Sequence, residues 1–259
     1  MESPVKTSIT QITPDQIIVR GFDLCELMGR LSFAEVVFLL IAQRLPTPGE
    51  GRILDAILVS SIDHGVDAPS THVARSVASC GVPVQSAISA GINAIGDSHG
   101  GAGEQCARIL QEALAAHPEV TFNELAHSMI TERQAAGQRV PGFGHRMHDP
   151  DPRAVRLLTL ADAEGISGRH VELARALEQA LRDTTRRSLP LNVDGAIAAI
   201  LSDLGIDWRF GKSLFIISRT AGLAAQVHEQ ITTGKPLKFA QPVNAEYIGS
   251  QPKKLPEQE

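Results

Sequence analysis

Two histidines and one aspartate, His99, His145 and Asp194, stand in backbone settings that suit acid–base chemistry. His99 lies in residues 96–103, an eight-residue stretch with four glycines, and His145 directly follows a Pro-Gly-Phe-Gly sequence. Glycine-rich backbone can turn tightly and lets a ligand approach closely. Asp194 is a carboxylate inside an otherwise apolar run. Together the three side chains form a plausible set of proton donors and acceptors for an enzyme.

Each of these residues also has a purely structural interpretation. The glycines around His99 are typical of a turn between two helices, with His99 at a helix start, where free N–H groups favour partial negative charge. Asp194, followed by Gly-Ala-Ile, is typical of a helix N-cap, and a catalytic aspartate can also be a cap. His145 and His148 have the i, i+3 spacing of metal ligands, but two nearby prolines argue against one helix that presents both. We therefore expect no metal site.

Helices must position these residues, because apolar side chains recur at helical spacing along most of the chain. Ser32-Phe-Ala-Glu35 predicts a capping box at one helix start, and residues 45–49 predict a Pro-rich break. Residues 16–21 predict one strand of a small β-hairpin, and the proline-containing residues 235–259 predict an extended arm. The fold class is thus all-α with one small hairpin near the N-terminus. The predicted helices cover residues 23–28, 36–41, 53–62, 71–79, 84–95, 104–115, 122–136, 150–163, 167–183, 193–204 and 213–232.

Composition narrows the functional class. The chain of 259 residues is 43% hydrophobic and 20% charged, as in an ordinary soluble globular protein. Its net charge of −5 gives no reason to expect nucleic acid or a membrane surface as a partner. The first residues lack the apolar segment of a signal peptide, and no apolar run is long enough to span a bilayer. Cys25, Cys80 and Cys106 lack metal-ligand spacing, so we expect reduced core cysteines in a cytoplasmic protein.

Three motifs occur in a fixed order: His-Gly-Gly at 99–101, Gly-His-Arg with Asp-Pro-Arg between 144 and 153, and Asn-Val-Asp at 192–194. With these motifs the chain resembles the citrate synthase superfamily from about Arg20 to the C-terminus. The resemblance implies a two-domain helical fold and a homodimer or higher homo-oligomer. The large domain would comprise residues 1–101 and 200–259, with a C-terminal arm from about residue 235, and the small domain residues 102–199.

The resemblance also implies a reaction, in which a carbon–carbon bond forms or breaks between the acetyl group of a CoA thioester and the ketone of oxaloacetate. His99 would hold the enol oxygen, Asp194 would exchange the proton at carbon, and His145 would handle the hydroxyl proton. A neutral imidazole suffices for His99 if its surroundings fix which nitrogen carries the proton. Burial would raise the pKa of Asp194 and so make it useful for proton exchange. Coenzyme A would enter as part of the substrate, with no permanently bound cofactor.

Binding residues follow from the same motifs. Arginine suits a polycarboxylate substrate because its guanidinium grips carboxylates in a bidentate manner. On local grounds, however, His64 could be a capping or core histidine, and a basic pair before residue 188 is also typical of a helix C-terminus. The resemblance assigns acyl-CoA and small polycarboxylates as substrates. It places substrate binding at His64, Arg146, Arg153, Phe215 and Arg219, and CoA binding at Gly142, Phe143, Gly144, Arg186 and Arg187.

Three departures from typical citrate synthases favour a particular reaction. The chain lacks about a hundred N-terminal residues, its Asp-His motif continues with Gly65, and Gln241 stands where a carboxylate-binding arginine is usual. These features resemble citryl-CoA lyases and the C-terminal part of ATP-citrate lyase. We therefore expect cleavage of citryl-CoA to acetyl-CoA and oxaloacetate. The alternatives are a condensing enzyme of the citrate synthase or 2-methylcitrate synthase type, and a non-catalytic CoA-ester-binding paralogue.

Overall fold

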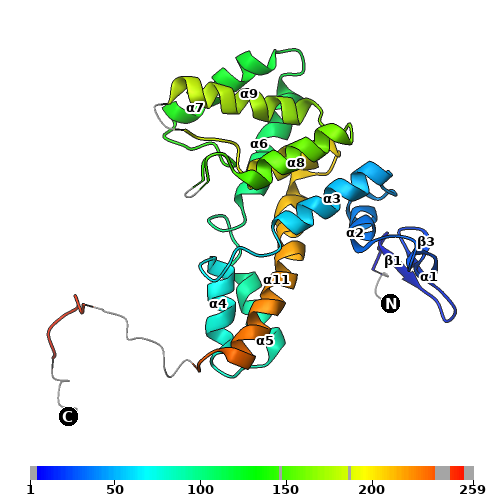
Figure 1. The fold of residues 1–259 in the computed structure, drawn as a ribbon, viewed down its shortest axis with the longest axis vertical. Helices are drawn as coiled ribbons and strands as arrows, with labels where there is room; N and C mark the ends of the chain where they lie inside the picture. The colour runs from blue at the N-terminus through cyan, green and yellow to red at the C-terminus, as the bar shows by residue number, and fades with distance from the viewer. Residues whose placement is uncertain (1–4, 146–147, 186–187, 237–245, 254–259) are drawn as a thin grey trace, which may run out of the picture.

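The computed structural model describes residues 5–145, 148–185, 188–236 and 246–253. This part of the chain holds eleven α-helices, one short 3-10 helix and one small sheet, so the predicted all-α class is confirmed (Figure 1). The strands are β1 (Thr10–Ile12), β2 (Ile17–Val19) and β3 (Phe22–Asp23). The helices are α1 (Leu24–Leu27), α2 (Phe33–Ala42), α3 (Pro48–Ser60), α4 (Pro69–Ala78), α5 (Val84–Asn93), α6 (Ala102–Ala116), α7 (Phe122–Ala135), α8 (Pro152–Ala163), α9 (Arg169–Thr184), α10 (Val193–Asp203), the 3-10 helix η1 (Trp208–Phe210) and α11 (Gly211–Thr233).

The predicted hairpin is a three-stranded antiparallel sheet of order β1-β2-β3. Thr10 pairs with Val19 across the first two strands, and Val19 pairs with Phe22 across the second and third. The sequence pattern located β2 but missed the third strand, which is only two residues long. In Figure 1 the sheet, α1 and α2 lie to one side of the longer helices.

Capping residues set the start of several helices. Ser32 and Glu35 form the predicted capping box of α2, in which each side chain bonds the other residue's backbone N–H. A second capping box, between Thr47 and Glu50, starts α3, and Pro48 occupies its first turn. The Pro-rich segment therefore ends one helix and begins the next, so α3 starts earlier than the apolar spacing predicts.

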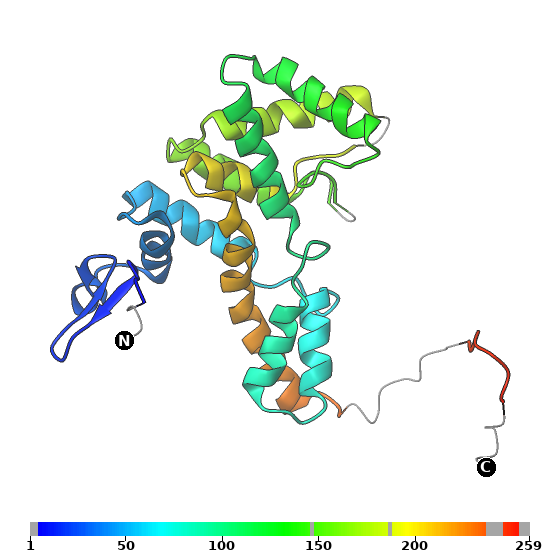
Figure 2. The ribbon, with the colours of Figure 1, turned by 180° about the vertical axis from the view of Figure 1, so that it is seen from behind.

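Within the described ranges, buried apolar side chains form two clusters. The larger unites α2, α3 and α6–α10 with the beginning of α11. The smaller cluster lies between α4, α5 and the second half of α11. Helices α4 and α5 pack against each other and against α11 there (Figure 2). The larger cluster draws on residues from both sides of the predicted boundaries near 101 and 199. The predicted division into domains stays a prediction.

Helix α11 joins the two clusters. Its 23 residues correspond to about 34 Å at 1.5 Å per residue. Leu214 belongs to the larger cluster, whereas Leu223 and Val227 belong to the smaller one. Neither α11 nor any other helix in the described ranges is both long enough and apolar enough to cross a membrane.

The expectation that all three cysteines are core residues is wrong for two of them. Cys25 is exposed because the four-residue helix α1 buries only Leu27, and Cys80 is exposed in the turn after α4. Cys106 is buried on α6, and burial raises the pKa of its thiol to about 12. All three thiols are free.

Candidate active site

His99 lies in the loop between α5 and α6. Its backbone exchanges two hydrogen bonds with Gly96, of 2.9 and 3.0 Å, which close a tight turn. The next residue, Gly100, has φ +83°, and a Cβ there would lie 2.6 Å from a ring carbon of Phe215. Helix α6 begins only at Ala102, so the expectation that His99 stands at the helix start is wrong. The turn holds the imidazole beside α11 instead.

The hydrogen bonds of His99 fix its tautomer. The backbone N–H of Ser70 donates to His99 Nε2 at 3.2 Å, and the Ser70 hydroxyl lies 2.9 Å from the same nitrogen. Because Nε2 accepts, the neutral ring carries its proton on Nδ1. Burial lowers the pKa of His99, and the positive Arg219 lowers it further. His99 is therefore a neutral imidazole with one N–H available as a donor.

Ser70 also connects His99 to α11. Arg219, only 3% exposed, donates from Nη1 to the Ser70 hydroxyl at 3.3 Å and from Nε to the Ser61 carbonyl at 3.0 Å. The Arg219 guanidinium carbon lies 4.8 Å from the centre of the Phe215 ring. Phe215 in turn meets the His99 ring edge-on, with 5.8 Å between centroids. The structure thus brings three predicted site residues together around Ser70, a residue for which the sequence pattern gives no functional signal.

Two further histidines, His148 and His64, lie next to His145. The backbone N–H of His148 donates to His145 Nδ1 at 3.1 Å, so the neutral His145 ring carries its proton on Nε2. The two rings stack with 4.5 Å between centroids, and His64 approaches His145 at 6.2 Å. His64 is exposed, which excludes the core interpretation of this residue. Burial lowers the pKa of His145, and the negative Asp151 opposes that shift.

The rings of His145 and His148, whose spacing is that of metal ligands, stack on one another. Nδ1 of His145 accepts a hydrogen bond from the backbone N–H of His148. No group of three or more His, Cys, Asp or Glu side chains suited to a metal ion occurs among the described residues.

Arg153 is held by the start of α8. The carboxylate of Asp151, which is fully buried, caps α8 by accepting from the backbone N–H of Arg153. It also accepts from Arg153 Nε at 3.1 Å and Nη2 at 3.0 Å. The helix starts at Pro152, two residues later than predicted, because Asp151 takes the capping position. Nη1 takes no part in this pair, which suits Arg153 to a second carboxylate.

Asp194 is the second residue of α10, and it is not the helix cap. The cap is Asn192, whose side chain accepts from the backbone N–H of Gly195 at 3.2 Å, so the N-cap interpretation of Asp194 is wrong. The half-buried Asp194 lines a cavity of about 10 Å³ together with Gly100 and Phe215. Burial raises the pKa of Asp194, Arg153 opposes the shift, and Asp151 adds to it. The carboxyl group thus keeps its proton to higher pH than an ordinary aspartate.

The predicted CoA-binding loop packs against the segment that leads to Asp194. Gly144 N–H donates to the Pro190 carbonyl at 2.7 Å, and Asn192 N–H donates to the Gly142 carbonyl at 3.0 Å. The Asn192 amide also donates to the Gly144 carbonyl at 2.8 Å. Gly142 has φ +85°, and a Cβ there would lie 2.7 Å from the Cα of Gly195. Glycine is required at this contact by both backbone conformation and space.

A cavity of about 600 Å³ opens beside this loop. Phe143, Gly144 and His145 form one side of it, and side chains of α7 and α9 form the other. Its size is in the range of cavities that bind small organic molecules. The remaining lining residues are Ile130, Arg133, Gln134, Gln138, Arg139, Val140, Leu181, Thr185 and Leu189.

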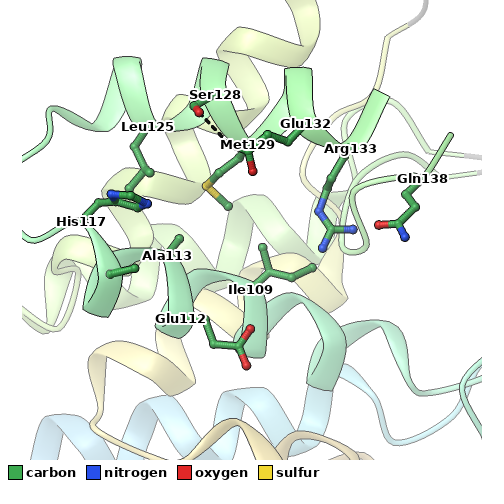
Figure 3. Close-up of a pocket in the computed structure, with 11 residues that line it drawn as sticks. Ile109, Glu112, Ala113, His117, Leu125, Ser128, Met129, Glu132, Arg133 and Gln138 are labelled. Atoms are coloured by element: carbon green, nitrogen blue, oxygen red, sulfur yellow. Dashed lines mark hydrogen bonds between the residues drawn. The ribbon is translucent and has the colours of Figure 1, made fainter. Parts of the chain in front are cut away.

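A second cavity, of about 380 Å³, lies between α6 and α7 (Figure 3). Arg133 and Gln138, at one end of it, also line the larger cavity. Glu112 of α6 and Glu132 of α7 line it from opposite helices, and Glu132 accepts a hydrogen bond from Ser128 (Figure 3). None of the predicted catalytic residues lines this second cavity.

Four residues named in the sequence analysis, Arg146, Arg186, Arg187 and Gln241, lie outside the described residues. The other predicted residues lie in two neighbouring groups, one around His99 and Ser70 and one around His145. The same charged residues act on both groups. Arg153 and Arg219 both act electrostatically on His64 and on Asp194. The roles assigned to these residues stay predictions, and the structure supplies the arrangement in which they could act.

Comparison with known proteins agrees with this all-α fold. A family profile described as "Citrate synthase, C-terminal domain" matches residues 46–240. The citrate synthases of Helicobacter pylori and Deinococcus radiodurans are 38% and 28% identical over 195 and 238 residues, respectively. These alignments cover 71% and 89% of this chain but only 44% and 60% of the relatives, so the chain spans about half the length of the curated relatives it matches. The chain belongs to the citrate synthase family, as its motifs predict.

Two solved structures are similar over nearly the whole chain. The structure of citryl-CoA lyase from Hydrogenobacter thermophilus has a TM-score of 0.89 and 40% identity, with 97% of each chain covered. The structure of ATP citrate lyase from Methanothrix soehngenii in complex with citrate and coenzyme A has a TM-score of 0.84 and 22% identity. It covers 97% of this chain and 43% of that one. At this identity the second likeness supports the fold alone.

Proposed function

We propose that the protein is a citryl-CoA lyase, which cleaves citryl-CoA to acetyl-CoA and oxaloacetate. The observation that carries this proposal is the likeness to citryl-CoA lyase over 97% of both chains at 40% identity. The chemistry of the site is consistent with it, because Phe215 contacts the donor fixed by Ser70 and lines a small cavity together with a carboxyl group of raised pKa.

Cleavage requires two proton transfers and one stabilised enolate. The hydroxyl proton of the substrate goes to His145 as the carbon–carbon bond breaks, which leaves the ketone of oxaloacetate and the enolate of acetyl-CoA. His99 donates from Nδ1 to the enolate oxygen, where a preorganised donor is most effective. Asp194 then gives its proton to the methylene carbon. His145 gains one proton and Asp194 loses one, so exchange with solvent restores the starting state.

This order of proton transfers requires a particular protonation state of the His145 ring. In the free protein its Nδ1 accepts from the N–H of His148, so the neutral ring has its proton on Nε2. To accept the hydroxyl proton at Nε2, the ring has to carry its other proton on Nδ1, and the bond to His148 is then lost. We propose that substrate binding breaks the hydrogen bond from His148, so that the ring proton of His145 moves to Nδ1.

Substrate recognition divides between the two sides of the site. Arg153 and Arg219 would bind the carboxylates of the oxaloacetate portion, with His64 beside them. The CoA portion would occupy the cavity of about 600 Å³ next to Phe143 and Gly144. Amphipathic walls of this kind suit a long thioester that carries polar groups along its length.

The second candidate function is that of a condensing enzyme. The family profile and the curated relatives are citrate synthases, including the Helicobacter pylori enzyme at 38% identity. The same residues serve condensation in reverse, with Asp194 as the base and His145 as the proton donor. A condensing enzyme of this type additionally hydrolyses the thioester and releases free CoA.

Supplying each substrate set separately tests the proposal. A lyase given citryl-CoA releases oxaloacetate and acetyl-CoA rapidly, and no free thiol appears. A synthase given acetyl-CoA and oxaloacetate liberates free CoA, which a thiol reagent detects. Thiol release from acetyl-CoA and oxaloacetate at a rate above citryl-CoA cleavage would overturn the lyase assignment, and no reaction with either set would favour a binding protein.

We also propose that two copies of the chain assemble. The cluster between α4, α5 and α11 contains five buried apolar residues in the described part, which is a small core for three helices. Val84 of α5 and Ile231 of α11 are about half exposed. We expect light scattering coupled to sizing to give at least twice the 27.7 kDa chain mass at micromolar concentration. A mass of one chain would contradict this expectation.

A further inference from the structure

Asp151 is the fully buried carboxylate of the site, and its hydrogen bonds reach two functional elements. One oxygen accepts from the backbone N–H and Nε of Arg153, at 3.0 and 3.1 Å. The other accepts from Arg153 Nη2 and from the backbone N–H of Val193, both at 3.0 Å. Val193 is the first residue of α10 and directly precedes Asp194. A single side chain therefore contacts both a predicted substrate arginine and the helix end that carries the predicted acid.

We propose that Asp151 is a positioning residue for both groups, which orients the Arg153 guanidinium for a substrate carboxylate and places a fixed negative charge at the start of α10 beside Asp194. This inference rests on the proposed function, because the roles of Arg153 and Asp194 belong to it. Asp151 itself contacts neither substrate nor reacting atoms in the proposed mechanism.

The effect on Arg153 follows from geometry. A bidentate pair with a buried carboxylate holds the planar guanidinium in one orientation. Burial opposes the charge of Asp151, but the hydrogen bonds from Arg153 and Val193 keep the pKa of Asp151 below its usual range. The carboxylate is therefore charged at neutral pH. Without it, Arg153 loses the partner that orients it.

The effect on Asp194 follows from charge. The groups that act on the Asp194 carboxyl are Asp151 and Arg153 at the start of α8 and Arg219 of α11, and the buried thiol of Cys106 on α6 also lies within electrostatic range. A negative neighbour disfavours ionisation of a carboxyl group, and a positive one favours it. Asp151 thus raises the pKa of Asp194, and Arg153 and Arg219 lower it.

The chain contains a matched control for the purely structural part of this role. Asp203 on α10 caps the start of α9, as Asp151 caps the start of α8 and reaches that of α10. Its carboxylate accepts from the backbone N–H groups of Gly168, His170 and Val171, at 2.7 to 3.0 Å. Asp203 lies at the opposite end of α10 from Asp194. Asp203→Asn therefore removes a buried capping charge without changing the site.

The test compares Asp151→Asn with Asp203→Asn. We expect Asp151→Asn to weaken the binding of oxaloacetate, measured by calorimetry, by at least about tenfold, the scale of one charge-assisted hydrogen bond. The titration of Asp194, followed by carbon-13 NMR of labelled aspartate and assigned with Asp194→Asn, should move to lower pH. If citryl-CoA is cleaved, the basic limb of the pH profile moves the same way. Asp203→Asn should lower thermal stability but change neither binding nor titration.

A second variant, Arg153→Gln, tests the inference if Asp151→Asn fails to fold. Arg153→Gln leaves Asp151 to bond Val193 and removes the positive neighbour, so the Asp194 titration should move to higher pH, opposite in sign to Asp151→Asn. An unchanged Asp194 titration in both variants, or equal changes in Asp151→Asn and Asp203→Asn, would overturn the inference. NMR and calorimetry need no turnover. A wild type that binds oxaloacetate but does not cleave citryl-CoA would refute the proposed function and leave this inference open to its own result.

Discussion

Replacing Asp194 by asparagine is expected to lower the turnover of citryl-CoA by at least about 100-fold, the scale of a positioned acid–base group. The amide has nearly the same shape as the carboxyl group but cannot deliver a proton to the methylene carbon. Stopped-flow detection of oxaloacetate gives the rate. Near-wild-type turnover in this variant would show that another group protonates the carbon.

The direction in which the cleavage rate changes with pH follows from the burial of Asp194. Cleavage needs the protonated form of Asp194, whose pKa is raised by burial. The rate should therefore fall as pH rises through that pKa, and it should also fall at low pH, where His145 is protonated and cannot accept the hydroxyl proton. Condensation needs the ionised form, so its rate should rise over the same range. A cleavage rate that increases across this range would contradict the assigned role of Asp194.

The Asp194 variant should fold at least as well as the wild type. A buried carboxyl group with a raised pKa destabilises the folded state once pH exceeds the pKa of the unfolded chain, and this cost grows until the folded-state pKa is passed. Asparagine removes the cost, so the unfolding temperature at neutral pH should be equal or higher. Asp55→Asn, on an exposed face of α3, serves as the control for turnover and stability.

The second large effect is expected for His99→Ala, again a loss of at least about 100-fold in turnover, as for removal of one oxyanion-type donor. The physical reason is the fixed Nδ1–H, which the Ser70 backbone enforces by occupying Nε2. Affinity for the CoA ester should change much less than turnover, because the donor acts on charge that develops during cleavage. Parallel calorimetry and rate measurements separate the two quantities.

Two further variants sharpen the His99 result. Ser70→Ala removes the hydroxyl but keeps the backbone N–H, so turnover should fall less than in His99→Ala. His127→Ala, an exposed histidine on α7, should leave the rate unchanged. If His99→Ala and His127→Ala behave alike, His99 does not stabilise the enolate.

The helices were predictable because their information is local. The periodicity of apolar residues located α4 to α11, and the Ser32–Glu35 pattern located the start of α2. An error of two residues arose where a cap decides the boundary, as with Asp151 at α8. Asp and Asn are both good capping residues, so the sequence alone does not choose between Asn192 and Asp194.

The site was predictable only as a set of motifs. The glycines around His99 indicate a turn, but its partner Ser70 is 29 positions away and carries no signal of its own. The contact of Asp151 with Val193 spans 42 positions and likewise depends on the packing of α8 on α10. Exposure of Cys25 and Cys80 was missed because residue type predicts burial only on average. Long-range contacts of this kind depend on the whole fold.

Helix α11 is a stiff connection between the larger and the smaller hydrophobic cluster. Its first half is fixed in the larger cluster near Asp194, its second half in the smaller cluster, and Phe215 and Arg219 lie between. Backbone hydrogen bonds make a continuous helix stiff over this length. The two clusters are therefore held at a fixed distance along α11, and bending of α11 or movement of the loop before α6 changes the separation of His99 from Asp194.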